Sequence, residues 1–207
     1  LPLKGAKKIL DFVDMDSQKW LLYSRIKPFP LSVGYWIEGQ KLARAEARLA
    51  RQFDLSLVVT QGELDVLKRL APDVNADFVS NGVDLKDFKP SDAPYDKNLI
   101  SFVGRFDYFP NEQAAVWFAS DVLPKITAKL PNMTLQIVGA NPSLRVRALV
   151  NHPNVIVTGT VASVAPFVQR SLATVAPLHI ARGVQNKVLE SMAMAVPALI
   201  SPEVAKG

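Results

Sequence analysis

The sequence contains no cysteine and only two histidines, His152 and His179. The lack of cysteine excludes disulfide bonds and thiolate metal sites, and a reducing cytoplasm is the simplest compartment for such a chain. Two histidines far apart in the sequence form no metal-binding pattern, so we expect no metal. No apolar run approaches the roughly 20 residues that cross a bilayer, and the first residues lack the order of a secretory signal. We therefore expect a cytoplasmic protein with neither metal nor cofactor.

The 207 residues are 49% hydrophobic and 21% charged, which is ordinary for a chain that buries a core. The formal net charge of +5 is uneven, because residues 1–51 hold ten Lys or Arg against five Asp or Glu. A basic surface of this kind is commonly just solvated. The alternative is peripheral contact with anionic lipid at the inner membrane surface. We do not expect a nucleic-acid partner.

Short apolar runs alternate with segments of helical period, which predicts an α/β protein. The runs are nearly continuous rather than alternating, which indicates parallel strands covered on both faces, in doubly wound sheets. In such sheets, ligands bind at the carboxyl ends of the strands. The predicted strands span residues 9–15, 55–60, 77–80, 99–104, 133–139, 155–158, 173–178 and 198–201. The predicted helices span residues 18–25, 34–52, 63–70, 112–130, 144–150, 164–169 and 184–195.

One stretch breaks this alternation. Asn81-Gly82 marks a turn, and the residues through Lys97 include Pro90 and Pro94 but show little apolar periodicity. We predict a first domain over residues 1–92 and a second over residues 93–207. Because the chain lacks an initiating Met and starts and stops close to strand-like runs, we interpret it as a fragment of two domains.

The segment 181–193 follows the predicted strand 173–178 and carries the most chemistry. At about 100° per residue, Gly183, Lys187 and Glu190 gather on one side of the predicted helix, away from its apolar face. A helix N-terminus at Gly183 would offer unpaired N–H groups to a diphosphate, and Lys187 would add a cation. Glu190 lies about 10 Å further along, within reach of the hydroxyls of a ribose. The alternative is that Lys187 and Glu190 form only an i,i+3 surface pair.

Several segments resemble the characteristic motifs of one protein family, and they occur in the same order as in that family. Residues 182–198 resemble an E-x7-E segment followed by an E-A-M-A-x-G-x-P-V run, and residues 80–90 resemble an N-G-V-D-x-x-x-F-x-P crossing between two domains. The other matches are a V-G-R turn at residues 103–105 and strand ends at residues 136–139, 158–161 and 175–178. Together they resemble the family-four glycosyltransferases of GT-B architecture. Residues 11–20 and 181–187 resemble, more narrowly, a bacterial exopolysaccharide sugar-transferase branch of that family.

The resemblance implies a GT-B fold with two Rossmann-like domains. Residues 1–92 would form the C-terminal part of the acceptor-side domain, and residues 93–207 a nucleotide-sugar-binding domain truncated at its C-terminus. Arg105 and Lys187 would face the donor phosphates, and Glu190 would hold the ribose. The other residues implied at the donor site are Gly104, Gly139, Gly159, Val161, His179, Arg182, Gly183, Gln185 and Asn186.

Asp14 and Asp16 stand at the end of the first predicted strand, where the family commonly has an acceptor-domain His. We predict that Asp14 contacts the acceptor and that Asp16 or Ser17 caps the next helix. The chain also departs from the family pattern. Arg182 replaces the first Glu of the E-x7-E segment, and Asn111 stands near the place of a second phosphate-binding Lys. The charge of Arg182 suggests a donor sugar that carries a carboxylate.

These residues predict a retaining glycosyltransferase of exopolysaccharide biosynthesis, which moves a sugar from a nucleoside diphosphate sugar to a glycan or lipid-linked acceptor. Asp14, Arg105 and Lys187 are its predicted catalytic residues. Stabilising the departing diphosphate with cations and a helix end requires no metal. A GT-B nucleotide-sugar epimerase and a non-catalytic nucleotide-binding module are the alternatives. A nicotinamide or flavin enzyme is disfavoured, because the turn after residues 99–104 lacks G-x-G-x-x-G. We expect the fragment itself to be inactive.

Overall fold

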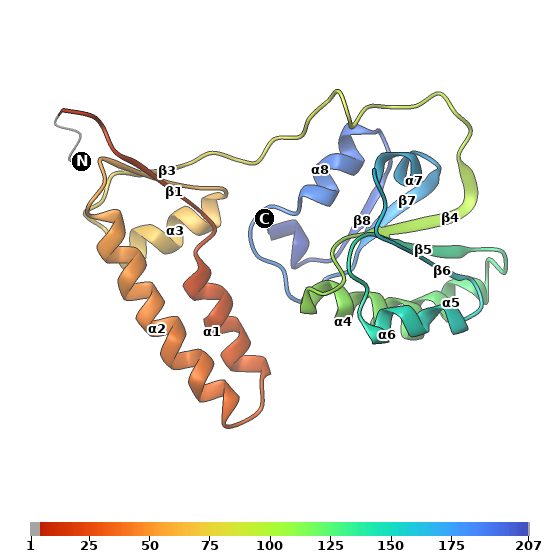
Figure 1. Cartoon of the computed structure of the whole chain (residues 1–207), viewed down its shortest axis with the longest axis horizontal. Coiled ribbons are helices and arrows are strands. Elements are labelled where there is room, and N and C mark those ends of the chain that lie inside the picture. The colour runs from red at the N-terminus through yellow and green to blue at the C-terminus, as the bar shows by residue number, and fades with distance from the viewer. Residues whose placement is uncertain (1–4, 207) are drawn as a thin grey trace. The chain divides into compact units, whose positions relative to one another are not determined.

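The computed structural model describes residues 5–206, which form two compact units (Figure 1). Unit 1 contains the described residues up to Asn81 together with Arg182–Val184. Unit 2 contains Gly82–Ala181 and Gln185–Lys206. The boundary predicted after residue 92 falls in a largely irregular segment, residues 79–95, and stays a prediction.

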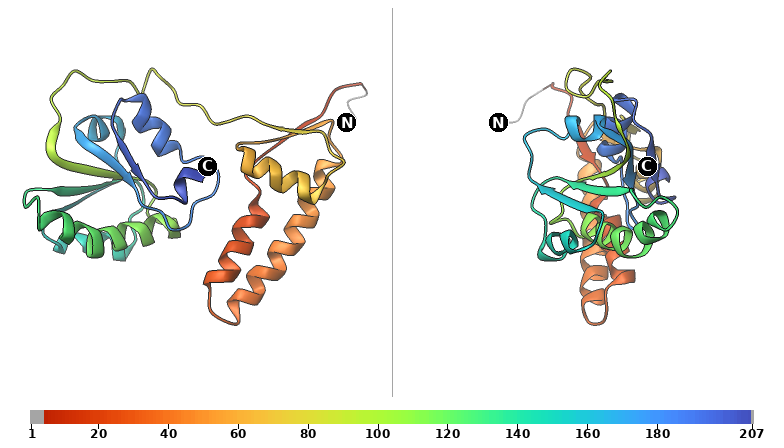
Figure 2. Two further views of the ribbon diagram at one scale, coloured as in Figure 1. Left: turned by 180° about the vertical axis from the view of Figure 1, so that it is seen from behind. Right: turned by 90° about the vertical axis from the view of Figure 1, so that its right-hand side faces the viewer.

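Unit 1 is built on a small parallel sheet with the strand order β1-β2-β3. Two of its helices form an antiparallel hairpin, whose members lie side by side in Figure 2. Gly39 permits this close approach, because a Cβ at Gly39 would lie 2.8 Å from Leu21 Cδ2. The strands are β1 (Ile9–Val13), β2 (Leu55–Val58) and β3 (Ala76–Phe78), and the helices are α1 (Asp16–Ile26), α2 (Leu31–Ala50) and α3 (Gln61–Leu70).

Unit 2 holds a five-stranded parallel sheet with the order β6-β5-β4-β7-β8. The chain winds outward from β4 in one direction to β6, then crosses to β7 and winds the other way. The carboxyl ends of β4 and β7 therefore form the switch point at which open α/β sheets bind ligands. The strands are β4 (Asp96–Val103), β5 (Thr134–Val138), β6 (Val155–Gly159), β7 (Ser171–Ala176) and β8 (Ala198–Ile200).

Helices cover both faces of this sheet, with α4, α5 and α6 on one face and α7 and α8 on the other (Figure 1). The predicted helix 112–130 is divided by a π-helical turn, just before Pro124, which has no N–H to donate. The helical segments are α4 (Phe109–Trp117), η1 (Phe118–Val122), α5 (Leu123–Thr127), α6 (Leu144–Arg147), η2 (Ala148–Asn151), α7 (Ala165–Gln169), α8 (Asn186–Ala193) and η3 (Val204–Lys206).

The predicted fold class is confirmed, because the structure has a strand at each predicted position and every strand pair is parallel. One boundary was wrong in a way that affects the site. Helix α8 begins at Asn186, whereas Gly183 lies in the preceding loop with a φ of +60°. The predicted helix tip at Gly183 therefore does not exist. Within residues 5–206, no helix has both the length and the apolar character needed to cross a bilayer.

Candidate functional site

Three glycines bring the carboxyl ends of β4, β5 and β6 together in unit 2. Gly104 N donates to the Val138 carbonyl at 3.1 Å, and Gly139 N donates to the Gly159 carbonyl at 3.2 Å. Gly139 has a φ of +143°, and a Cβ there would collide with the Gly104 carbonyl. Because Gly104 and Gly139 have no side chains, their loops can pack closely together at this edge, whereas at Gly159 nothing lies within 4 Å of where a Cβ would be.

Lys187 lies on the first turn of α8, close to the end of β4. Its Nζ donates to Asn111 Oδ1 at 2.7 Å and stands 5.1 Å from the centre of the Phe102 ring. A Cβ at Gly104 would lie 3.3 Å from the same Nζ. The residue as a whole is partly exposed, yet burial of its ammonium lowers the pKa of Lys187 to about 8.

No ion pair to Lys187 occurs within the described part of the chain, although most buried cations in proteins have an acidic partner. The nearest carboxylate that affects its pKa is that of Glu190 on the same helix. A desolvated ammonium held by a neutral amide is a ready site for an anion, since the anion would supply the missing counter-charge.

Asn111, which the sequence marked only as standing near the place of a second phosphate-binding Lys, positions Lys187. It is buried in the first turn of α4, and its Nδ2 donates to the Arg105 carbonyl at 2.9 Å while its Oδ1 accepts from Lys187. The amide thus joins the turn after β4 to helix α8. A signal was present in the sequence, because an Asn followed the V-G-R turn at the start of an apolar helix.

Glu190 is half-buried one turn beyond Lys187. Burial raises the pKa of the Glu190 carboxyl, and the neighbouring Lys187 lowers it in part. The i,i+3 surface ion pair considered as the alternative does not form within 4.0 Å in residues 5–206. The two side chains therefore remain available to separate parts of a ligand.

Arg105 is exposed and forms an ion pair with Asp107. Its Nη2 donates to Asp107 Oδ2 at 2.8 Å, and the same oxygen accepts from Asn141 Nδ2 at 3.1 Å. In this structure the guanidinium is therefore part of a surface cluster rather than an unpaired cation. Its role at a phosphate stays a prediction.

The remaining residues predicted in unit 2 lie around the same edge of the sheet. Gln185 is the residue before α8 and Asn186 its first residue. His179 is exposed after β7 and packs against Trp117, with ring centres 4.5 Å apart. Val161 is half-buried just beyond β6. A cavity of about 350 Å³ beside the end of β6 is lined by Asn141, Pro142, Arg147, Val150, Val157, Thr158, Gly159 and Thr160.

In unit 1, Asp14 stands at the carboxyl end of β1. Its Oδ1 is buried without a hydrogen-bond partner in the described residues. Burial raises the pKa of Asp14, the nearby Asp16 raises it further, and Arg182 acts in the opposite direction. A carboxyl with a raised pKa in a loop at a strand end suits proton exchange with a hydroxyl group.

The predicted cap of α1 was wrong. Met15 is the N-cap residue and supplies no side-chain cap, whereas Asp16 and Ser17 already lie inside the helix. Two buried acids from other helices serve the free N–H groups instead. Glu63 Oε2 accepts from Met15 N at 3.0 Å, and Glu46 Oε1 accepts from Ser17 N at 2.9 Å.

Arg182 and Gly183 belong to unit 1 and contact its acids. Arg182 Nη2 donates to Glu63 Oε1 at 3.0 Å, and a Cβ at Gly183 would collide with the Asp14 carboxylate. Burial raises the pKa of Glu63, and Arg182 partly offsets this effect. Because Arg182 already pairs with a buried acid, its charge no longer supports the suggestion of a carboxylate-bearing donor sugar. Its contact with a phosphate stays a prediction.

Comparison with known proteins identifies the family. Residues 97–206 match the family model described as glycosyl transferases group 1. No curated protein matches the chain. Among solved structures, Anabaena HepE with UDP-glucose superposes with a TM-score of 0.68 at 13% identity, covering 96% of this chain and 54% of that one.

Two more solved structures show the same likeness. Sucrose-phosphate synthase from Thermosynechococcus elongatus has a TM-score of 0.67 at 16% identity, covering 94% of this chain and 50% of that one. Staphylococcus aureus TarM in complex with UDP has a TM-score of 0.61 at 15% identity, covering 79% and 32%. This chain thus spans about half the length of these neighbours or less, and at such identities they establish the fold alone, which is of the GT-B type. Because the family model covers more than half of the sequence, the chain belongs to the glycosyl transferases group 1 family.

Proposed function

We propose that the edge of unit 2 around Lys187 binds the nucleoside diphosphate sugar donor of a glycosyltransferase. The observation that carries this proposal is the buried ammonium of Lys187, whose only hydrogen-bond partner within residues 5–206 is the neutral Asn111 amide. It lies at the switch point of a parallel sheet, where ligands of this fold class bind. A diphosphate would supply the counter-charge that the described residues do not.

In the proposed complex, Lys187 and the first N–H groups of α8 meet the diphosphate. Glu190 accepts from the hydroxyls of the ribose, and the backbone near Gly104 and Gly139 lies along the phosphates. Stabilising the negative charge that develops on the leaving diphosphate is then the main catalytic effect, and it uses no metal. Arg105 would contribute only after leaving Asp107. The further donor contacts we propose are Gly159, Val161, His179, Arg182, Gly183, Gln185 and Asn186.

We infer that the nucleotide is UDP. Two of the structural neighbours contain it, HepE with UDP-glucose and TarM with UDP. The cavity of about 350 Å³ beside the end of β6 is large enough for part of a nucleoside. A UDP-hexose is therefore the donor to test first.

We further propose that the transfer proceeds with retention to a hydroxyl of a glycan or lipid-linked acceptor in exopolysaccharide biosynthesis. Asp14 is the proposed acceptor contact, supported by its raised pKa and its position at a strand end. The location we propose is the cytoplasm, in peripheral contact with the inner membrane surface, supported by the basic first quarter of the sequence. The domain roles proposed from the resemblance are acceptor side for residues 1–92 and donor side for residues 93–207.

Calorimetric titration of the chain with UDP and with GDP tests the proposal. We expect weak binding of UDP, and the variant Lys187→Gln should weaken it roughly 10- to 100-fold, because hydrogen bonds to charged groups contribute about 1.5–3 kcal/mol. Lys125→Gln, on the exposed surface of α5, is the matched control and should bind as the wild type does. Equal UDP binding by Lys187→Gln, or binding of neither nucleotide, would remove the proposal.

A further inference from the structure

Helix α2 carries one continuous stripe that is apolar at its start and basic toward its end. At about 100° per residue, Val33, Ile37, Arg44 and Arg48 fall within an arc of about 60° on the helix. This arc lies well away from the face that Gly39, Ala43 and Ala50 pack against the rest of unit 1. The stripe is therefore a solvent-facing surface with two chemically different halves.

The apolar half lies at the tip of the α1–α2 hairpin, at the end away from strands β1 and β3 (Figure 1). Phe29 in the connection is 81% exposed and Trp36 is 53% exposed. Val33 and Ile37 on the stripe itself are exposed as well. Single exposed apolar residues are ordinary, but a cluster at the tip of a hairpin marks an interaction site.

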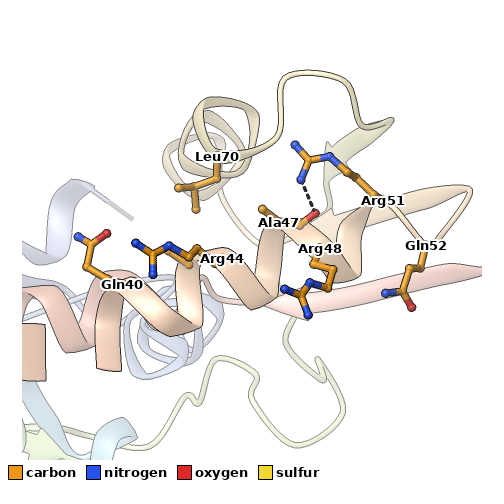
Figure 3. A pocket seen from close by; sticks show the side chains of 8 residues that line it. Gln40, Arg44, Ala47, Arg48, Arg51, Gln52 and Leu70 are labelled. Carbon is orange, nitrogen blue, oxygen red and sulfur yellow. Dashed lines mark hydrogen bonds between the residues drawn. The ribbon is translucent and has the colours of Figure 1, made fainter. Parts of the chain in front are cut away.

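The basic half forms a groove of about 690 Å³ between α2 and the end of α3 (Figure 3). Within the described residues, Arg44 and Arg48 enter no ion pair, whereas Arg51 is held by Asp73 at 3.0 Å and by the Ala47 carbonyl at 3.2 Å. The residues that line the groove are Gln40, Ala43, Arg44, Ala47, Arg48, Arg51, Gln52 and Leu70.

Acids that could cancel this charge are few along the hairpin. Residues 17–52 contain seven Lys or Arg and two Glu. Of these two acids, Glu38 pairs with Lys41 at 2.9 Å, and Glu46 is buried against the N-terminus of α1. Asp16, the first residue of α1, lies just outside this range; it is exposed and enters no ion pair within residues 5–206. Cations therefore outnumber exposed, unpaired acids along the described hairpin.

We propose that this stripe docks unit 1 on an anionic lipid surface. Val33 and Ile37 of the stripe, with Phe29 and Trp36 beside them at the hairpin tip, enter the interface between headgroups and acyl chains. Arg44 and Arg48 meet lipid phosphates in the groove. Trp, Phe and Arg suit this boundary, because each combines an apolar body with polar or charged contacts. A free phosphate ion would leave the apolar half without a role, and a second copy would bring like charges together. The inference rests on the proposed peripheral location and names the surface that provides it.

Sedimentation of the full chain with phosphatidylcholine vesicles, with and without phosphatidylglycerol, tests the proposal. Binding should require phosphatidylglycerol and should weaken with added salt. The double variant Arg44→Gln/Arg48→Gln should lower the partition coefficient roughly 30-fold, at about 1 kcal/mol per cation near an anionic surface and tenfold per 1.4 kcal/mol. Phe29→Ser should lower it as well, by removing apolar area from the interface.

Matched controls lie on unit 2. Lys125→Gln/Lys129→Gln removes the same charge from exposed positions, and Leu144→Ser removes an apolar side chain that is 82% exposed. Both controls should keep most of the vesicle binding. Equal loss in the controls, equal binding to vesicles without phosphatidylglycerol, or release by glycerol phosphate at constant ionic strength would overturn the proposal. So would a dimer that Phe29→Ser dissociates while vesicle binding is unchanged.

UDP titration of Arg44→Gln/Arg48→Gln separates this inference from the donor site. The variant should bind UDP as the wild type does, since neither arginine is among the proposed donor contacts. Loss of vesicle binding with UDP binding intact supports lipid docking by the stripe. Vesicle binding that persists in the double variant rejects the stripe, even if UDP binding confirms the donor site.

Discussion

If Lys187 binds the diphosphate, the affinity for UDP should depend on pH. Burial lowers the pKa of Lys187 to about 8, so the unliganded side chain loses its proton above that pH. A bound diphosphate favours the protonated form and raises the pKa again. UDP binding should therefore be strongest below about pH 8 and weaken about tenfold per pH unit above it, until the pKa of the bound state is reached.

The titration of Lys187 should also make the folded state more stable as pH rises, which is opposite to the trend in UDP binding. Between about pH 8 and 10.5 the unfolded state binds the Lys187 proton and the folded state does not, so this group's contribution to the unfolding free energy rises with pH. Calorimetric UDP titrations and urea unfolding over the same pH range measure both trends. Lys187→Gln should flatten both profiles, whereas Lys125→Gln should leave both unchanged. A flat UDP profile in the wild type would contradict the assignment.

Gly139 provides a second prediction at the residue scale. Gly139→Ala places a methyl group on the Gly104 carbonyl and imposes a φ of +143° on an L-residue. We expect a loss of about 1–3 kcal/mol in the free energy of unfolding, the usual cost of a strained backbone position. Gly159→Ala is the control, because its φ is also positive, at +72°, but nothing lies within 4 Å of the added Cβ. Urea unfolding followed by circular dichroism measures both, and equal losses would show that crowding at Gly104 plays no part.

At the scale of elements, the strands were predictable because parallel strands buried on both faces leave nearly continuous apolar runs. Helix α8 was predicted two residues too early, since the apolar period that marks its face includes Val184 in the loop. The positive φ of Gly183 and the extended backbone of Gln185, the N-cap residue, keep Val184 out of the helix, and backbone angles cannot be read from a sequence. Lys187 and Glu190 could nevertheless be predicted to lie on one helix, because their spacing is local information, and their roles at the donor stay predictions.

Partners on different elements could not be found in this way. Asn111 reaches Lys187 across 76 positions, and Glu46 reaches the N-terminus of α1 across 29. Such contacts depend on how the helices pack in three dimensions. The periodicity of apolar residues along the sequence does not reveal this packing. The one accessible hint was Thr60, whose side chain caps α3 by accepting from Glu63 N and thereby fixes the position of Glu63.

The acid at the start of α1 leads to a prediction about helix packing. Glu46 Oε1 accepts from Ser17 N, but its Oε2 is buried without a partner and burial raises the pKa of the carboxyl. The folded state therefore holds this proton to a higher pH than the unfolded state, and the stability it contributes is lost as pH rises through the raised pKa. Glu46→Gln keeps an oxygen for Ser17 N and removes the buried charge.

We expect Glu46→Gln to unfold at higher urea than the wild type at neutral pH, by roughly 1 kcal/mol, because a neutral amide without a partner costs less to bury than a carboxylate does. The gain should vanish near pH 4, where the wild-type carboxyl is protonated in both states. Glu38→Gln, on the exposed side of α2, should change stability by less than about 0.5 kcal/mol at either pH. A destabilised Glu46→Gln at neutral pH would instead make the carboxylate charge a favourable cap of α1.

At the scale of the whole molecule, the apolar residues form separate cores. The core of unit 1 gathers Met15, Val58, Val66 and Leu67, and the main core of unit 2 gathers Phe102, Phe106, Leu135 and Ile137. None of the core clusters in residues 5–206 draws its buried members from both units. The proposed donor site depends on the second core, and the proposed lipid-docking stripe depends on the first.

Because each unit has its own core, shortening a core side chain should destabilise mainly the unit that contains it. Leu67 and Leu135 are both fully buried, so Leu67→Ala and Leu135→Ala should each cost about 2–5 kcal/mol in the unit that contains the residue. Hydrogen exchange read by mass spectrometry locates the loss. Leu67→Ala should speed exchange in residues 9–70 and alter UDP binding only through Arg182 and Gly183, which belong to unit 1, whereas Leu135→Ala should speed exchange in residues 99–176 and weaken UDP binding more strongly. If either variant accelerated exchange equally in both ranges, the two cores would have to unfold as one cooperative structure, and binding assays on stripe variants would no longer be independent of the donor site.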